Sequence, residues 1–451
     1  MMKNIRRFFL FLLILSLVCS SALAEMTVTK KNKGFSDAAL SAENGILSYA
    51  FTAPEYQYLT LKYKTSDESG TVVIEGADGQ FSGSIPLLYT MEAKTATLTV
   101  LSMNQKELFA MRVPLAASAV DTPKDENGAA GRVDDLTLTA GANSMSYRFT
   151  ASGRNSVSLS FRTVAQRGTV TVYPDENGVF FGTLSLPYAH ASDLVTVTLK
   201  TAKGKKLAEA QERLAFVAPE IGDTSVDGPL SGVIVCLDPG HQSLPVSIAR
   251  VQKMPGSNET AKGGSAGQAQ GCVTLRKESI VVLEIAYKAC QALRELGATV
   301  YMTRWEEEVS ITNMERAAYA NEVNADYFIR IHLNLADSKT ANAIYVYSPK
   351  NSAYAKEAAD EETYRSMTTA LLEALKTATG VEGGRTRFSD QFIANNWAKM
   401  PAFLIEAGFM STPANDLLCS YAPYQQRIAD GIAQGVVEME RIKQESQKES
   451  N

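Results

Sequence analysis

Two histidines and one glutamate in the second half of the chain have the residue types and positions that hydrolytic chemistry needs. His241, His332 and Glu406 each end, or closely follow, a short apolar run. Two imidazoles and one carboxylate suit a hydrolytic zinc that keeps one position open for water. Such an ion brings the pKa of its bound water to about 7 and polarises a carbonyl group. A further carboxylate is then needed to move protons.

The third metal ligand is ambiguous from spacing alone. The chain has three histidines, and His190 falls in a predicted loop of the first half, where we assign it no role. A lone histidine is more often a buried structural residue, but two that end separate strands of one domain make a stronger signal. Glu278 opens the helix predicted at 278–296, and Glu284 lies about a turn and a half into it. Glu278 is better placed to face the strand ends, and Glu284 stays the alternative.

An α/β domain must position these residues. From residue 232 onward, short apolar strands alternate with longer segments of helical periodicity. The strands are predicted at 232–237, 298–302, 327–332, 344–347 and 402–406, and the helices at 278–296, 311–324, 354–378 and 413–442. This alternation predicts a largely parallel sheet flanked by helices, within a catalytic domain at 232–443 and before a polar tail at 444–451. Ligands of such sheets bind at the carboxyl ends of the strands.

The first half of the chain is a tandem repeat. Residues 42–53 (AENGILSYAFTA) match residues 140–151 (AGANSMSYRFTA), and further matches follow in both copies. Apolar residues alternate with period two, and Asp-Gly and Asn-Gly turns separate the segments, which is typical of antiparallel hairpins. We therefore predict two all-β, sandwich-like modules with a polar linker after each. The modules are placed at 25–118 and 132–218, and the linkers at 119–131 and 219–231.

The N-terminus has the three regions of a secretory signal peptide. A basic start (1–7) precedes a continuous apolar run (8–18), and Ala22-Leu23-Ala24 supplies small residues before a cut. The run is shorter than the about 20 residues that a membrane helix needs. We predict cleavage after residue 24 and no stable membrane span afterwards, and the alternative is an uncleaved anchor.

Composition limits the class of partner. The chain has 451 residues, of which 45% are hydrophobic and 21% charged, so it can form packed cores. Its formal net charge of −5 argues against nucleic acid as the main partner, because phosphate binding needs a basic surface. None of the five cysteines forms a C-x-x-C pair, which makes a zinc knuckle or a redox motif a poor interpretation.

The motifs of the second half resemble one known family. They are Asp238-Pro239-Gly240-His241, Glu278, Ile331-His332-Leu333-Asn334 and the run from Leu404 to Phe409. In order and spacing they resemble the zinc-dependent N-acetylmuramoyl-L-alanine amidases with an amidase-3 type catalytic domain, over residues 232–442. The resemblance extends to Thr303-Arg304 and to residues 313–316. The long segment between the first two motifs, 242–274, resembles a subgroup with a longer loop, and that loop is a candidate regulator of the site.

The resemblance implies an activity and roles for individual residues. His241, Glu278 and His332 would bind one Zn²⁺ per chain, and Glu406 would be the catalytic carboxylate. The bond cut would be the amide between the lactyl group of muramic acid and L-alanine, in a secreted, cell-wall-associated peptidoglycan hydrolase. The β modules would contact the wall or a protein partner. Asn334, Arg385 and Arg387 are candidates to orient the substrate, although a surface role fits each equally well.

Two other functions remain open from the sequence. One is a catalytically silent, amidase-like protein that binds the wall, and the other is a zinc peptidase of the wall. Metal content separates an enzyme from a silent binder. Product analysis separates the two enzymes, because only an amidase leaves free lactyl groups on the glycan and intact stem peptides.

Overall fold

The computed structural model describes residues 26–90, 93–115, 132–221, 226–246, 249–262 and 267–449. The predicted signal peptide (1–24) and the predicted linker at 119–131 lie outside these residues. The chain divides into two compact units, residues 1–216 and 217–451.

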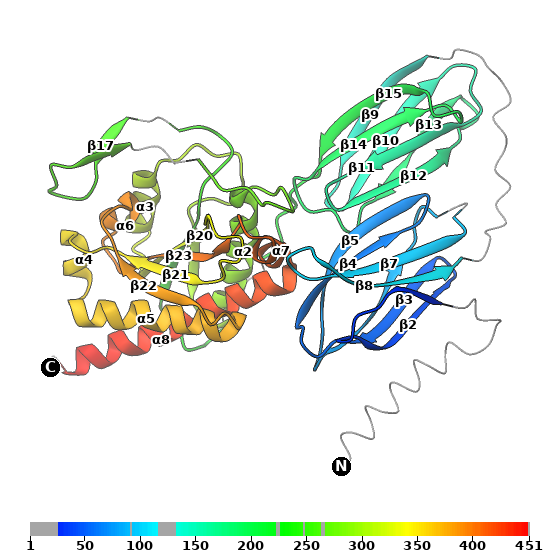
Figure 1. Cartoon of the computed structure of the whole chain (residues 1–451). Helices are drawn as coiled ribbons and strands as arrows, with labels where there is room; N and C mark the ends of the chain where they lie inside the picture. Colours follow the sequence, from blue (N-terminus) through cyan, green and yellow to red (C-terminus); the bar gives the residue numbers. More distant parts are fainter. Residues whose placement is uncertain are drawn as a thin grey trace. The chain divides into compact units, whose positions relative to one another are not determined.

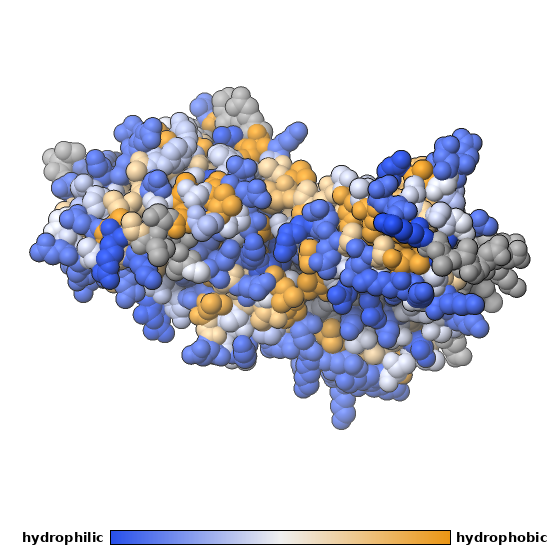
Figure 2. Space-filling view, turned by 90° about the horizontal axis from the view of Figure 1, so that it is seen from above, coloured by the Kyte–Doolittle hydropathy of each residue, from blue (hydrophilic) through white to orange (hydrophobic). Residues whose placement is uncertain are grey.

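Hydrophilic residues cover most of the face shown in Figure 2. Within the described ranges, no helix has the length and apolar character needed to cross a membrane.

The first unit is all-β (Figure 1). The strands of the first repeat are β1 (Thr27–Lys30), β2 (Ser36–Glu43), β3 (Ile46–Thr52), β4 (Tyr58–Lys64), β5 (Glu68–Glu75), β6 (Gln80–Pro86), β7 (Thr95–Leu101) and β8 (Glu107–Pro114). Those of the second are β9 (Val133–Ala140), β10 (Ser144–Ala151), β11 (Val157–Arg162), β12 (Gln166–Val172), β13 (Val179–Ser185), β14 (Leu194–Lys200) and β15 (Lys206–Arg213).

Each repeat encloses its own apolar core between a small sheet and part of a large one. In the first repeat the small sheet is β2-β3-β6, and in the second it is β9-β10-β13. Alternate residues of the strands point into these cores, as the period-two pattern predicts. Stacked phenylalanine pairs occupy matching places, with ring centroids 5.2 Å apart for Phe51 and Phe81 and 4.7 Å apart for Phe149 and Phe180. The all-β character of this half is therefore confirmed.

The two repeats share one continuous sheet. The order of its nine strands is β1-β8-β7-β4-β5-β12-β11-β14-β15, so strands of the first repeat lead directly into strands of the second. The junction is an antiparallel pairing of β5 with β12, in which Ser69 lies opposite Arg167. This pairing satisfies backbone groups that an edge strand would leave open. The sequence predicted two modules joined by a linker, and that prediction did not include a sheet shared by the two repeats.

The second unit contains a sheet of six strands in the order β19-β16-β20-β23-β21-β22. Their bounds are β16 (Ile234–Pro239), β19 (Thr299–Met302), β20 (Tyr327–Asn334), β21 (Ile344–Ser348), β22 (Gly384–Phe388) and β23 (Ala402–Phe409). The first four strands in this order are parallel, but β21 runs antiparallel to β23. The predicted largely parallel sheet is thus a mixed one. Residues 335–343 before β21 contain no helix, and a parallel return needs a longer crossover.

Helices cover the sheet. They are α2 (Glu278–Glu295), α3 (Asn313–Glu322), α4 (Ala353–Ala358), α5 (Glu361–Thr379), α6 (Ile393–Trp397), α7 (Pro413–Ser420) and α8 (Ala422–Glu449). Helices α5 and α8 lie below the sheet in Figure 1, and α3 and α6 lie above it. The predicted apolar stripe of α2 is buried at Ile280, Leu283 and Tyr287, and this helix also packs on α8. A small hairpin of β17 (Arg250–Gln252) and β18 (Thr260–Lys262) lies within the segment predicted as a long loop.

Candidate metal-dependent active site

The end of β16 brings His241 close to the neighbouring strand β20. The backbone of Gly240 donates a hydrogen bond of 2.9 Å to the carbonyl of Ile331. A Cβ atom at Gly240 would overlap the ring of His332, so only glycine lets this ring lie against the backbone. His241 follows with a left-handed backbone, at a φ of +58°. The turn therefore aims one imidazole at the other, and their ring centroids are 4.9 Å apart.

Glu278, the first residue of α2, lies between the two imidazoles. Its Oε2 atom is 3.2 Å from His241 Nε2, and its Oε1 atom is 3.2 Å from His332 Nδ1. Backbone amides of Leu333 and Ala269 donate to the same two oxygens at 3.0 and 2.9 Å. The candidate ligand atoms of the three residues all lie within 4.8 Å of one another. The structure thus brings together the three residues that the sequence proposes as metal ligands.

The alternative ligand, Glu284, lies elsewhere. Its carboxylate accepts hydrogen bonds from Arg276 at 2.5 Å and from Gln425 at 2.7 Å. It lies about 1.7 turns further along α2 than Glu278, where the helix packs on α8 instead of the strand ends. Position at the helix start favoured Glu278 in the sequence, and the packing of α2 confirms that Glu278, not Glu284, lies beside the imidazoles.

The chemistry of the donor set fits a divalent metal ion. Burial lowers the pKa of His332 to about 4, so its imidazole is neutral near pH 7, as metal binding requires. Burial opposes ionisation of Glu278, but hydrogen bonds with His241 and His332 outweigh it and hold its pKa well below the usual range. His332 Nε2 is buried and has no hydrogen-bond partner among the residues described. A neutral imidazole with a buried nitrogen that lacks a partner, together with a second imidazole and an anionic carboxylate, is a donor set that fits a divalent metal ion.

Glu406 lies next to the candidate ligands on the adjacent strand. It faces His332 directly in the pairing of β23 with β20. Its Oε2 atom is buried and finds no hydrogen-bond partner in the described part of the chain. Burial and the nearby charge of Glu278 raise the pKa of Glu406 to about 8, against an opposing effect of Arg330. A carboxyl group that titrates near neutral pH inside such a site is a candidate general acid and base.

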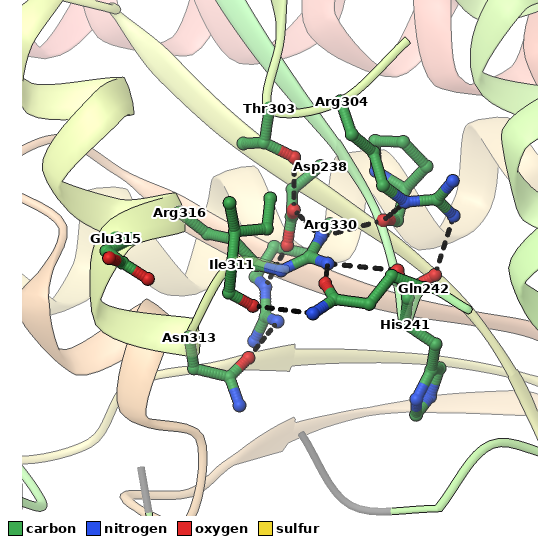
Figure 3. A network of polar contacts seen from close by, with 12 residues as sticks. Asp238, His241, Gln242, Thr303, Arg304, Ile311, Asn313, Glu315, Arg316 and Arg330 are labelled. Carbon is green, nitrogen blue, oxygen red and sulfur yellow. Dashed lines mark hydrogen bonds and ion pairs between the residues drawn. The ribbon is translucent and has the colours of Figure 1, made fainter. Parts of the chain in front are cut away.

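A buried ionic network adjoins the segment that carries His241 (Figure 3). Asp238 is fully buried and accepts hydrogen bonds from Arg316 at 2.5 Å, Arg330 at 2.7 Å and Thr303 at 2.6 Å. Burial disfavours its ionised form, but the two guanidinium groups outweigh this effect and hold its pKa below the usual range. Sequence reasoning assigned these residues no role. The sequence signal was Asp238 within the apolar strand β16 and Arg330 within the apolar strand β20, because buried charges must be paired.

Two arginines of this network hold the segments that carry the candidate ligands. Arg316 donates to the carbonyl groups of Pro239 and His241 at 2.9 Å each, and also to the side chain of Gln242. Arg304 donates to the carbonyl of Gly240 at 2.9 Å and to that of Ser279 at 2.7 Å. One guanidinium group therefore joins the end of β16 to the first turn of α2, and it sets the separation of His241 and Glu278.

The residues proposed to orient the substrate are less closely grouped. The Oδ1 atom of Asn334 accepts a hydrogen bond of 2.7 Å from the backbone of Leu335, which follows it in the chain. Arg385 is exposed on β22, three strands away from His332 in the sheet order, which corresponds to about 14 Å. Arg387 is also exposed, and its guanidinium lies over the ring of Tyr345 at 5.3 Å. Neither arginine touches the candidate ligands.

Comparison with known proteins identifies a matching family. Residues 235–438 match a family model described as N-acetylmuramoyl-L-alanine amidase. A germination-specific N-acetylmuramoyl-L-alanine amidase of Bacillus subtilis (strain 168) is 30% identical over 224 residues, which cover 46% of this chain and 80% of that protein. The amidase AmiC of Neisseria meningitidis serogroup B is 28% identical over 194 residues, 36% of this chain and 46% of that protein. The solved structure of the amidase Ami1 from Mycobacterium smegmatis is 22% identical, covers 47% of this chain and 97% of that one, and has a TM-score of 0.41.

Proposed function

The chain belongs to the N-acetylmuramoyl-L-alanine amidases, and we propose that it is a secreted, zinc-dependent member that hydrolyses peptidoglycan. The family model and the relative from Bacillus subtilis support the activity. The observation that carries the zinc proposal is the grouping of His241, Glu278 and His332 within 4.8 Å, with Glu406 on the adjacent strand. The bond cut is the amide between the lactyl group of muramic acid and the L-alanine of the stem peptide.

In the proposed mechanism the candidate ligands and Glu406 divide the work. His241, Glu278 and His332 would hold the ion. Zinc in such a site supplies a Lewis acid for the scissile carbonyl and makes water a nucleophile at neutral pH. Glu406 accepts the proton of the attacking water and returns it to the alanine nitrogen as the amide breaks. Its pKa of about 8 in the metal-free chain lets it hold and release a proton near neutral pH.

The supporting network makes this arrangement rigid. Arg304 joins the two backbone segments that carry His241 and Glu278, and Arg316 holds the carbonyl of His241. Groups held in advance of binding lose little entropy when substrate and metal arrive, which favours both affinity and rate. Asn334, Arg385 and Arg387 stay candidates for contacts with more distant parts of the substrate.

The remaining parts of the proposal concern location. The predicted signal peptide at residues 1–24 would export the chain, and the bond that the proposed activity cuts lies in the cell wall. We propose that the mature protein acts in the wall and that its β modules contact wall material. The acidic net charge gives no support to nucleic acid as a partner.

The proposal is tested with Glu406→Gln and a matched control, Glu445→Gln, at an exposed position of α8. We expect Glu406→Gln to keep zinc, measured as metal per chain, and to release almost no free alanine amino termini from purified peptidoglycan. The control should retain full activity. Full activity in Glu406→Gln would refute its role. Cleavage within the stem peptides by the unmodified chain would show a peptidase instead, and a chain without metal and without activity would be a silent binder.

A further inference from the structure

One row of side chains crosses the whole nine-stranded sheet on the face that points away from the apolar cores. The strand register places its members directly opposite one another from strand to strand. In sheet order they are Thr27, Arg112, Thr97, Lys64, Ser69, Arg167, Arg162, Thr196 and Gln211. Their neighbours along each strand, such as Tyr63, Leu98 and Phe161, point into the cores. At about 4.8 Å per strand, the row is about 38 Å long.

The charge of this row is entirely positive. Arg112, Lys64, Arg167 and Arg162 are exposed, and within the described ranges none of them forms an ion pair. The row contains no carboxylate, although the protein as a whole is acidic, with a net charge of −5. Four exposed cations on one line, none of them in an ion pair among the described residues, fit a negatively charged ligand.

Carboxylates on the same face lie outside the row, and two of them have cation partners of their own. Glu107 is 3.4 Å from Lys30, and Glu209 is 3.0 Å from Lys206. Each of these two carboxylates therefore has a lysine partner that lies outside the row.

Threonine and serine hydroxyl groups lie between the cations on this face of the sheet. A polar groove of about 740 Å³ lies over the sheet of the first repeat. Its lining includes Lys62, Lys64, Thr97, Thr99 and Arg112. The second repeat continues the pattern with Ser160 and Thr169, whose hydroxyl oxygens are 3.1 Å apart. Rows of hydroxyls beside guanidinium and ammonium groups provide donors and acceptors for sugar hydroxyls and donors for carboxylates.

The junction between the repeats makes the row continuous. Arg167 of β12 donates a hydrogen bond of 2.9 Å from Nε to the hydroxyl of Ser69 on β5. The row of cations therefore extends from the first repeat into the second across adjacent strands. A small anion would need only one such position, whereas a continuous row fits a ligand that is itself extended and repeats its charge.

We propose that this face of the shared sheet binds an anionic glycan strand of peptidoglycan. The sugars would contact the threonine and serine hydroxyls, and carboxylates along the strand would contact the four cations. The choice of peptidoglycan rests on the proposed function, since amide hydrolysis itself leaves a lactyl carboxylate on each sugar unit that it strips. Binding through a second surface raises the effective concentration of the catalytic unit at an insoluble substrate.

The test uses the full chain with Glu406→Gln, so that the ligand is not degraded. The row variant combines Lys64→Gln, Arg112→Gln, Arg162→Gln and Arg167→Gln. A control variant removes the same number of exposed charges from the second unit, at Lys356, Arg365, Arg441 and Lys448. Binding is measured by co-sedimentation with purified peptidoglycan from which phosphate polymers have been removed, both intact and after partial digestion by the unmodified chain, which exposes lactyl carboxylates. We expect the row variant to bind about tenfold more weakly and with less salt dependence, because it lacks four exposed charge contacts. The control should bind like the parent.

Several results would overturn the proposal. One is equal binding of the row variant and its parent, and another is equal weakening in the control. Binding that requires the phosphate polymers would assign the surface to that polymer instead. If the row variant does not fold, the double variant Lys64→Gln with Arg112→Gln, confined to the groove, replaces it under the same criteria. If the chain shows no amidase activity but the row variant still binds more weakly than its parent, the proposed function is refuted and this inference is supported.

Discussion

Replacing Asp238 with asparagine tests whether the buried network supports the catalytic unit. The substitution keeps the shape of the side chain and removes its charge. Asp238 is fully buried, and Arg316 and Arg330 donate to it at 2.5 and 2.7 Å. Without the carboxylate, two buried guanidinium groups lose their common counter-charge. Removing one partner of a buried ion pair costs about 3–5 kcal/mol, and we expect the free energy of unfolding of the second unit to fall by this amount.

The chain offers a direct assay for this unit. It contains two tryptophans, Trp305 and Trp397, and both lie in residues 217–451. Their fluorescence during urea denaturation therefore reports the unfolding of the catalytic unit alone. A loss of about 3–5 kcal/mol moves the urea midpoint by about 1–2 M. Asp430→Asn, at an exposed position of α8, is the matched control, and its unfolding free energy should change by less than about 0.5 kcal/mol.

The pH dependence gives a second criterion. The pKa of Asp238 in the folded chain lies below the usual range, while that in the unfolded chain is about 3.9. Its contribution is therefore complete above the unfolded pKa and is lost as pH falls through the folded pKa. The difference between the parent and Asp238→Asn should stay constant from about pH 5 to 8 and shrink only in stronger acid. A loss below about 1 kcal/mol, or a difference that changes between about pH 6 and 8, would refute the argument.

Three further predictions concern the site itself. Gly240→Ala should lose most of its metal while the first unit stays folded, because the new Cβ overlaps His332, and metal analysis of the purified chain checks this. Arg304→Met should weaken metal affinity by about 10–100-fold in a chelator competition, since it removes the link between the strand end and α2; unchanged affinity would contradict a positioning role. In chelator-treated protein, Glu406→Gln should be more stable than the parent at pH 8, because folding raises the pKa of the parent's carboxyl to about 8 and so disfavours its ionised form. This advantage should disappear near pH 4, where the carboxyl is mostly protonated in the folded and the unfolded state. A difference in thermal melting temperature that does not change with pH would disprove the prediction.

Several features were readable from the sequence because they depend on local order. The apolar stripe of α2 and the alternation in β7 follow from the periods of helix and strand, and both elements have the predicted buried faces. The internal repeat predicted the all-β half. The motifs carrying His241, His332 and Glu406 predicted a site at strand ends, since strand termini of one parallel sheet meet at one edge. Their roles as ligands and catalytic carboxylate stay predictions.

Tertiary structure decided what depends on neighbours that are distant in the chain. The sequence favoured Glu278 over Glu284 but left both open, and the packing of α2 places Glu278 between the imidazoles and Glu284 against Arg276. The direction of β21, and the pairing of β5 with β12 that joins the repeats into one sheet, were likewise invisible to periodicity. So was Asp238 as the common counter-charge of two arginines that follow 78 and 92 residues later. Sequence patterns report which face of an element is buried, but the partner on that face is set by packing between segments, and packing is a property of the whole fold.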